Sequence, residues 1–181
     1  MSLLKSVVSL PLLLSVSSAL AGPFTLSSPD IAEGEIMPLE MEFSGFGCEG
    51  GNLSPALSWS GAPKGTKSYA LTVYDPDAPT GSGWWHWFVA GIPADVHALE
   101  KGTRAETLPS GAFQLQNDYG GRDFGGACPP EGEMHRYQFT VHALDVEALP
   151  INENVSSALA GFMVGAHTLD SAAITAVYVR K

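Results

Sequence analysis

Positive charge is scarce in this sequence. Its 181 residues include 9 Lys and Arg against 19 Asp and Glu, a formal net charge of −10. Proteins that bind nucleic acid use Lys and Arg to displace counterions from the phosphates, so this balance argues against a nucleic-acid partner. Charged residues make up only 15% of the chain and hydrophobic residues 45%, which argues against a disordered protein. The length suits one domain with a real core.

Long hydrophobic runs are also scarce, and the first 21 residues hold the main candidate. An apolar run from Val7 to Val16 follows a single cation and precedes the small-residue ending Ala19-Leu20-Ala21. This layout is typical of a cleaved secretory signal peptide. The run is too short, and too interrupted by Ser and Pro, for a transmembrane anchor. We therefore expect a signal peptide at 1–21, a single mature domain at 22–181, no integral membrane insertion, and a periplasmic or secreted protein.

There are only two cysteines, Cys48 and Cys128. In an oxidising compartment such a pair tends to form a disulfide, and a loop of about 80 residues would contribute about 4 kcal/mol on the chain-entropy model. Two separate thiols remain the alternative, because the sequence does not place the two Cα atoms within bridging distance. Neither cysteine lies in a C-x-x-C spacing, which argues against a metal site built on them.

Glycine and proline are plentiful, at 20 and 13 residues, and argue against a helical bundle. Period-two alternation or continuous apolar runs instead predict a β-rich chain. The expected strands are Leu39–Phe43, Ser68–Tyr74, Trp87–Ile92, Tyr137–Leu144 and Ala173–Val179.

One segment, 155–166, has helical spacing. Its apolar stripe consists of Val155, Leu159, Phe162, Met163 and Ala166. No internal repeat or linker divides the chain, so we expect one β-rich domain.

Two loops concentrate unusual residues. The first is Asp75-Pro76-Asp77-Ala78-Pro79, followed by Trp84-Trp85-His86-Trp87. The second is Gly125-Gly126-Ala127-Cys128-Pro129-Pro130, followed by His135-Arg136-Tyr137. Each loop puts ionisable groups at a strand end, where rigid scaffolds present functional residues. The prolines of the first loop restrict its backbone and hold its carboxylates in place.

The joint pattern D-P-D-A-P, W-H and G-G-x-C-P-P…H-R-Y resembles the phosphatidylethanolamine-binding protein family, in particular its bacterial Raf kinase inhibitor-like branch. The resemblance extends from Cys48-Glu49-Gly50 to Ala166-His167-Thr168-Leu169. It implies a mainly β fold in which two antiparallel sheets form a Greek-key sandwich with a few short peripheral helices. It also implies a small pocket for phosphate or a phosphoryl headgroup, no cofactor, and a homodimer.

The pocket residues that the resemblance implies come from both loops. They are Asp75, Asp77, Pro79, His86, Gly126, Ala127, Cys128, His135 and Tyr137. Ala127 stands where the branch commonly has proline, which leaves the loop backbone looser.

The chemistry of such a pocket can be argued from the residue types. Two histidines would donate N–H groups to an anion, and a nearby Asp75 or Asp77 would raise their pKa values. The N–H groups of the glycine-rich loop would form a nest for phosphate. Because the carboxylates repel a dianion, we expect modest affinity for free phosphate. Binding should improve when an organic group lies beside Trp84, Trp85 and Trp87.

Each site residue also has a structural interpretation. Asp75 or Asp77 can cap its own turn, His86 can be a core histidine, and Arg136 can pair with a carboxylate. Only the joint pattern favours a binding site.

We expect a non-enzymatic binding or regulatory protein that recognises a phosphorylated small molecule, headgroup or protein segment. One alternative is a hydrolase or metal enzyme, because two histidines and a carboxylate can form a metal triad or a general base. The sequence has neither H-E-x-x-H nor G-x-S-x-G, so we predict no metal site and no catalytic residue. A surface-acting interaction or inhibitor protein with a vestigial pocket is the other alternative.

Overall fold

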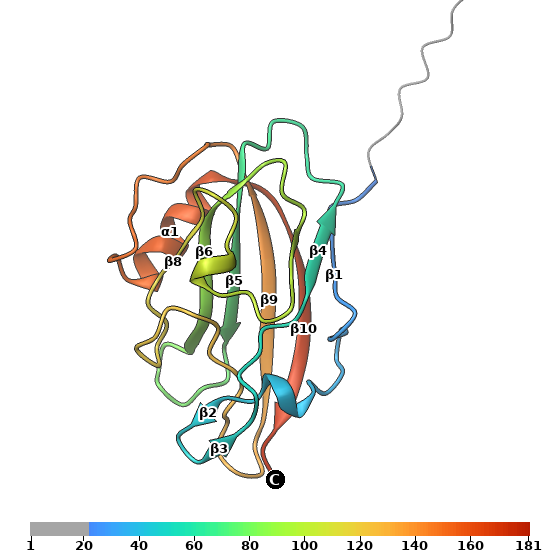
Figure 1. The fold of residues 1–181 in the computed structure, drawn as a ribbon, viewed down its shortest axis with the longest axis vertical. Coiled ribbons are helices and arrows are strands. Elements are labelled where there is room, and N and C mark those ends of the chain that lie inside the picture. Colours follow the sequence, from blue (N-terminus) through green and yellow to red (C-terminus); the bar gives the residue numbers. More distant parts are fainter. Residues whose placement is uncertain (1–21) are drawn as a thin grey trace, which may run out of the picture.

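Five antiparallel strands form the central sheet, in the order β10-β9-β5-β6-β8. They are β5 (Ser68–Asp75), β6 (Trp84–Pro93), β8 (Phe113–Gln114), β9 (Met134–Leu144) and β10 (Thr168–Val179). After β8 the chain returns and places β9 beside β5, which is a Greek-key connection (Figure 1). The structure is a computed structural model that describes residues 22–181, so the expected signal peptide lies outside the described residues.

Two smaller sheets accompany the central one. The strands β1 (Thr25–Ser27), β4 (Leu57–Ser60) and β7 (Ala98–Leu99) form an antiparallel sheet, and β1 packs against β10. The strands β2 (Ser44–Gly45) and β3 (Cys48–Glu49) form a short hairpin. The expected mainly β class with antiparallel sheets is confirmed, with this hairpin as an addition.

Both faces of the central sheet are covered. Leu71 and Val73 of β5 pack in the core that the central sheet shares with the β1-β4-β7 sheet. On the opposite face, Ala70 packs in a second cluster with Ala160 and Val164 of helix α1 (Ser157–His167). Strands buried on both faces carry near-continuous apolar runs. This explains the sequences of β5 and β6, and four of the five expected strands are confirmed as parts of β5, β6, β9 and β10.

The expected helix is confirmed as α1, and its expected apolar stripe is confirmed only in part, because Val155 and Met163 pack partly buried against the second cluster. The buried residues of α1 are Ser157, Ala160 and Val164, whereas Leu159 and Phe162 are 48% and 72% exposed. The large aromatic side chains of β6 already fill the space beneath the helix. Small helical residues therefore face the sheet and let the helix approach closely.

The strand expected at Leu39–Phe43 is also wrong, because Leu39–Met41 forms a 3-10 helix, η1. Met41 and Glu42 are both buried, which an alternating strand does not allow. Glu42 is buried because its carboxylate accepts a 2.5 Å hydrogen bond from the Tyr178 hydroxyl. A second 3-10 helix, η2, spans Ala105–Thr107.

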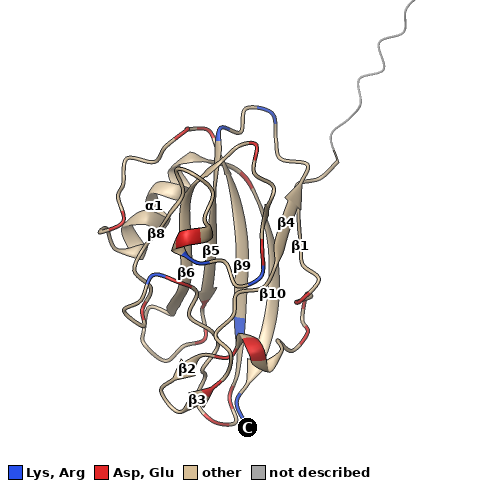
Figure 2. Ribbon diagram, in the orientation of Figure 1, with Lys and Arg blue, Asp and Glu red and all other residues tan. Residues whose placement is uncertain are grey.

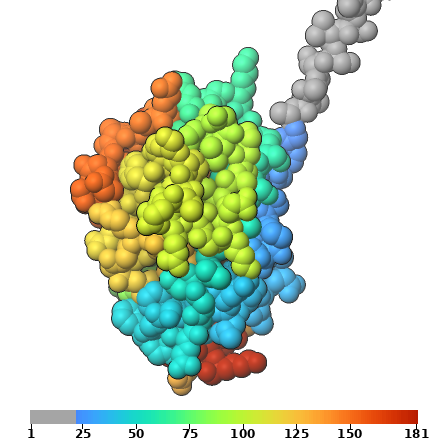
Figure 3. All heavy atoms as spheres, viewed as in Figure 1, coloured from blue at the N-terminus to red at the C-terminus, as the bar shows by residue number. Residues whose placement is uncertain are grey.

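Four strand ends meet at one end of the central sheet. Asp75 at the end of β5 pairs with Trp84 at the start of β6, and Val179 at the end of β10 pairs with Met134 at the start of β9. The β2–β3 hairpin lies at this same end (Figure 1). Charged positions lie mainly in loops and at strand ends (Figure 2). The chain between β6 and β9 covers the middle of the face that Figure 3 shows, and earlier segments of the chain cover the lower part.

Within residues 22–181, no helix is long and apolar enough to cross a membrane.

Candidate functional site

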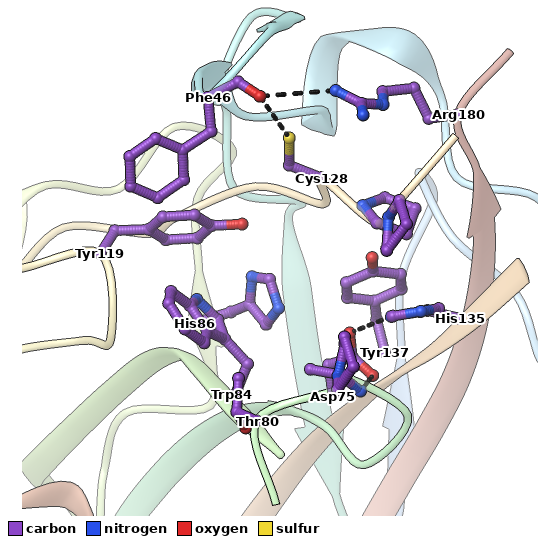
Figure 4. Close-up of a pocket in the computed structure, with 14 residues that line it drawn as sticks. Phe46, Asp75, Thr80, Trp84, His86, Tyr119, Cys128, His135, Tyr137 and Arg180 are labelled. Carbon is purple, nitrogen blue, oxygen red and sulfur yellow. Dashed lines mark hydrogen bonds and ion pairs between the residues drawn. The ribbon is translucent and has the colours of Figure 1, made fainter. Parts of the chain in front are cut away.

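A pocket of about 290 Å³ lies where the four strand ends meet (Figure 4). Its lining residues are Phe46, Asp75, Ala78, Pro79, Thr80, Trp84, His86, Tyr119, Cys128, Pro129, Pro130, His135, Tyr137 and Arg180. The structure therefore brings together six of the nine site residues expected from the sequence, and Asp77, Gly126 and Ala127 do not line the pocket.

Asp75 is a buried carboxylate with three hydrogen bonds. Its Oδ2 atom accepts from His135 Nδ1 at 2.7 Å. Its Oδ1 atom accepts from the backbone N–H groups of Asp77 and Ala78 at 2.8 and 3.2 Å. On its other side, the His135 ring has Nε2 3.6 Å from the Glu133 carboxylate. Asp75 thus caps its own turn, as the structural interpretation expected, and also fixes the His135 ring in the pocket wall.

His86 differs from the expectation. Its Nδ1 lies 2.7 Å from the Gly125 carbonyl oxygen and 3.1 Å from that of Gly126, so Nδ1 carries the proton and donates. Burial lowers the pKa of His86 to about 4, and this effect outweighs the opposing effects of the two carbonyls and of Asp75. The expected rise in pKa is wrong for this residue. A neutral His86 has no N–H left for an anion, and its Nε2 is an acceptor.

The expected nest of loop N–H groups is also wrong for Gly125, Gly126 and Ala127. Their N–H groups donate to the His86 carbonyl, the Asn52 side chain and the Met41 carbonyl at 2.9, 2.7 and 3.1 Å. The loop packs directly on the neighbouring backbone, since a Cβ on Gly126 would lie 2.2 Å from the Met41 carbonyl oxygen. None of these three residues lines the pocket, and Gly125 and Gly126 position the His86 ring through their carbonyl groups.

Asp77 pairs with Arg136 outside the pocket. The guanidinium donates from Nε and Nη2 to the two carboxylate oxygens at 2.9 and 2.7 Å, and the Arg136 backbone N–H adds a third bond. The hydrogen bond from the Arg136 side chain is the main cause that lowers the pKa of Asp77 to about 2. The structural interpretation of Arg136 is confirmed. Asp77 holds the first loop against β9.

A disulfide joins Cys48 of the hairpin to Cys128 of the pocket wall, as expected from the pair of cysteines. The same hairpin carries Phe46 at its tip, with φ of 53°, and the Phe46 ring lies 5.5 Å from that of Tyr119. Hairpin and loop together form one rim of the pocket, and Figure 4 shows both aromatic rings at this rim.

Sequence reasoning missed four lining residues: Phe46, Thr80, Tyr119 and Arg180. Arg180 follows β10, and its Nη1 lies 3.4 Å from the Phe46 carbonyl oxygen while its Nη2 lies 3.9 Å from Glu131. Among the described residues that line the pocket, it is the single Lys or Arg. Only the pairing of β10 with β9 brings it to the end of the sheet where the pocket lies, so no local sequence signal could have identified it.

Unsatisfied polar atoms gather around the pocket. In residues 22–181, six buried side-chain nitrogen or oxygen atoms have no hydrogen-bond partner, and four belong to lining residues. These four are Trp84 Nε1, His86 Nε2, the Tyr137 hydroxyl and Arg180 Nε. Burial raises the pKa of Tyr137, so its hydroxyl stays protonated. Buried polar groups are normally paired, and an unpaired one costs about 1–3 kcal/mol.

The metal triad considered from the sequence does not assemble. No group of three or more His, Cys, Asp or Glu side chains in residues 22–181 is arranged to hold a metal ion.

Comparisons with known proteins identify relatives of this chain. YbcL of Escherichia coli is 54% identical over 179 residues, which cover 97% of this chain and 98% of YbcL. Its crystal structure, described as a new member of the mammalian PEBP family, superposes with a TM-score of 0.85 over 87% of this chain and 99% of that one. YbhB of E. coli is 48% identical over 155 residues, 84% of this chain and 98% of its own length.

A more distant relative, LppC of Mycobacterium tuberculosis, carries a lipoprotein name. It is 38% identical over 127 residues, 70% of this chain and 58% of its own. The phosphatidylethanolamine-binding protein family itself matches residues 27–179. Because this match spans most of the chain and includes the strands that build the pocket, the chain belongs to the phosphatidylethanolamine-binding protein family.

Proposed function

We propose that this protein is a non-enzymatic binding or regulatory protein whose pocket recognises a phosphoryl group joined to an organic group. The observation that carries the proposal is the set of four buried, unpartnered polar atoms around one pocket. Two of them, Trp84 Nε1 and Arg180 Nε, can only donate, so they call for an oxygen-rich ligand. Arg180 also supplies the positive charge that favours an anion.

An organic portion of the ligand has an apolar surface to contact. Phe46, Trp84 and Tyr119 line the pocket together with three prolines, Pro79, Pro129 and Pro130. The Trp84 and Tyr119 rings lie 5.2 Å apart in an edge-to-face arrangement, which gives the wall a fixed shape. This surface supports binding of a phosphorylated small molecule or headgroup over free phosphate.

Two observations support a binding role over a hydrolase. The Thr80 hydroxyl donates to the Gly83 carbonyl at 2.5 Å, and the Cys128 sulfur is held in the disulfide. Neither is poised as a nucleophile beside a base, the arrangement that covalent hydrolases use. The Asp75–His135 pair serves to shape the wall in this proposal.

We also propose a periplasmic or secreted location. Three observations support it: the N-terminal signal-peptide pattern, the Cys48–Cys128 disulfide, and the lipoprotein name of LppC. The homodimer that the family resemblance implies stays a prediction.

Calorimetric titration with phosphoethanolamine and with inorganic phosphate near pH 5.5 tests the binding role. Tyr137→Phe removes a hydroxyl that has no partner in the protein, so we expect an unchanged melting temperature and affinity lower by about tenfold. Arg180→Gln should weaken binding at least as much. The control is Tyr74→Phe, whose hydroxyl donates to the Ser82 carbonyl away from the pocket.

A folded wild-type protein that binds neither compound would contradict the proposal. It would favour the surface-acting interaction or inhibitor protein with a vestigial pocket. Turnover of a phosphate or carboxylate ester that Tyr137→Phe and Arg180→Gln abolish would instead favour the hydrolase.

A further inference from the structure

We propose that the pocket selects a phosphate monoester in its singly protonated form, over the dianion of the same compound and over a phosphate diester. This inference rests on the proposed function and adds the chemical class and protonation state of the ligand. It follows from which pocket atoms donate hydrogen bonds and which accept them.

Among the four unpartnered pocket atoms, Nε2 of His86 is the one that can only accept a hydrogen bond. Its Nδ1 proton is directed at the carbonyl oxygens of Gly125 and Gly126, neither of which can donate, so Nε2 keeps its lone pair. This nitrogen is buried, unpartnered and on a residue that lines the pocket. A ligand oxygen without a proton would place its own lone pair against that of Nε2. A ligand O–H would donate to it.

The other three unpartnered atoms can all donate hydrogen bonds, so they favour a ligand with oxygen atoms that accept. Trp84 Nε1 and Arg180 Nε are donors only, and the Tyr137 hydroxyl can donate or accept. The pocket therefore calls for one group that donates once and accepts at least twice within a small space. A singly protonated phosphate monoester has one acidic O–H and two charged oxygens on the same phosphorus. Its dianion and a diester both lack the O–H.

The charges around the pocket also favour a ligand with one negative charge over a ligand with two. Arg180 is the cation of the lining, and Glu131 lies 3.9 Å from it. Asp75 lies in the wall, and Glu133 lies 3.6 Å from His135. The titratable and charged groups that line the pocket or act on His86 are Asp75, Asp118, Tyr119, His135, Tyr137 and Arg180, whereas Glu131 and Glu133 are exposed neighbours of Arg180 and His135. Carboxylates outnumber the one arginine, so a second negative charge on the ligand is disfavoured.

The test compares two isomers in the mature protein. Ethyl phosphate and dimethyl phosphate have the same atoms, and at pH 5 both carry one negative charge. Only ethyl phosphate has an acidic O–H. We expect ethyl phosphate to bind at least tenfold more tightly at pH 5, by calorimetry or by NMR titration. Because the second pKa of a phosphate monoester is about 6, its affinity should fall roughly 100-fold by pH 8.

A third probe separates titration of the ligand from titration of the protein. Ethylphosphonate has a higher second pKa than ethyl phosphate, so its loss of affinity should occur at higher pH. A midpoint that is the same for both probes would instead reflect the titration of a group of the protein.

Two variants test whether His86 is the residue that selects the protonated phosphoryl group. His86→Asn keeps an amide N–H for the Gly125 carbonyl but removes the acceptor nitrogen, so the preference for ethyl over dimethyl phosphate should disappear. Tyr137→Phe is the matched control and should weaken both probes while preserving the pH profile. Thermal melts confirm that each variant is folded.

The outcomes distinguish the two proposals. Equal binding of the isomers at pH 5, or a flat pH profile, overturns the protonation-state inference and leaves the phosphoryl-binding function standing. Binding of none of the three probes at millimolar concentration by the folded protein overturns both.

Discussion

Stability should fall steeply between pH 7.5 and pH 5, because two buried histidines must be neutral in the folded protein. Burial lowers the pKa of both His86 and His142 to about 4, while an unfolded histidine has a pKa near 6.5. Below pH 6.5 the unfolded chain therefore binds more protons than the folded one. Acidification favours unfolding until about pH 4, where both states are protonated.

The magnitude follows from the size of the shifts. A difference of about 2.5 pKa units corresponds to about 3 kcal/mol for each histidine when fully expressed. At pH 5, roughly 2 kcal/mol of this has been lost, or about 4 kcal/mol for the two together. That is a large fraction of the total stability of an ordinary domain.

Urea unfolding at pH 7.5 and pH 5 measures the loss. His142 lies on β9 with Nε2 3.2 Å from the Thr72 hydroxyl, away from the pocket, so His142→Gln tests one contribution without touching the site. This variant and His86→Asn should each reduce the pH-dependent loss by about half, and the double variant should remove most of it. NMR titration of the two rings checks the assignment directly.

Two results would refute the reasoning. One is a His86 ring that titrates near pH 6.5 in the folded protein. The other is a double variant that loses as much stability at pH 5 as the wild type. The first would also remove the fixed acceptor on which selection of a protonated phosphoryl group depends.

Two further predictions concern the frame of the pocket. Cys48→Ala combined with Cys128→Ala should lower the free energy of unfolding by about 4 kcal/mol, measured in urea without reductant, because the disulfide closes a loop of about 80 residues; a loss under about 1 kcal/mol would contradict this. Gly126→Ala should lower stability by about 3 kcal/mol or prevent folding, since its Cβ would lie 2.2 Å from the Met41 carbonyl oxygen. A Gly126→Ala variant as stable as the wild type in thermal melts would show that the loop at Gly126 moves away from Met41 at little cost.

The sequence predicted the sheet strands well and the peripheral segments poorly. Runs such as that of β5 are specified by burial on both faces, so their pattern is strong and local. Residues 39–43 alternate just as clearly, yet Leu39–Met41 form a 3-10 helix and Glu42, directly after it, turns inward to Tyr178 on β10. That partner lies 136 residues away in the sequence and no local pattern reveals it. The exposed Phe162 of α1 likewise depends on what the sheet presents to the helix.

For the site, the motifs identified the right side chains but not the directions of their hydrogen bonds. Asp75, His86, His135 and Tyr137 all line one pocket, as expected. The expectation of two N–H donors failed because two carbonyls use the His86 proton. The residue type tells which hydrogen bonds a side chain can make. The packing around it decides which donor or acceptor atom stays available for a ligand.

Because the disulfide joins two loops that are distant in the sequence, changes in one loop constrain the other. The hairpin around Cys48 and the loop around Cys128 form one rim of the pocket, while its floor is built from strand ends whose positions the sheet register fixes. A change in the length of either loop must be matched by the other if the bond is to form. Ligand preference can therefore diversify among homologues by exchange of the two loops as a pair, with the sheet inherited unchanged. A grafting experiment that transfers one loop alone should give a misfolded rim.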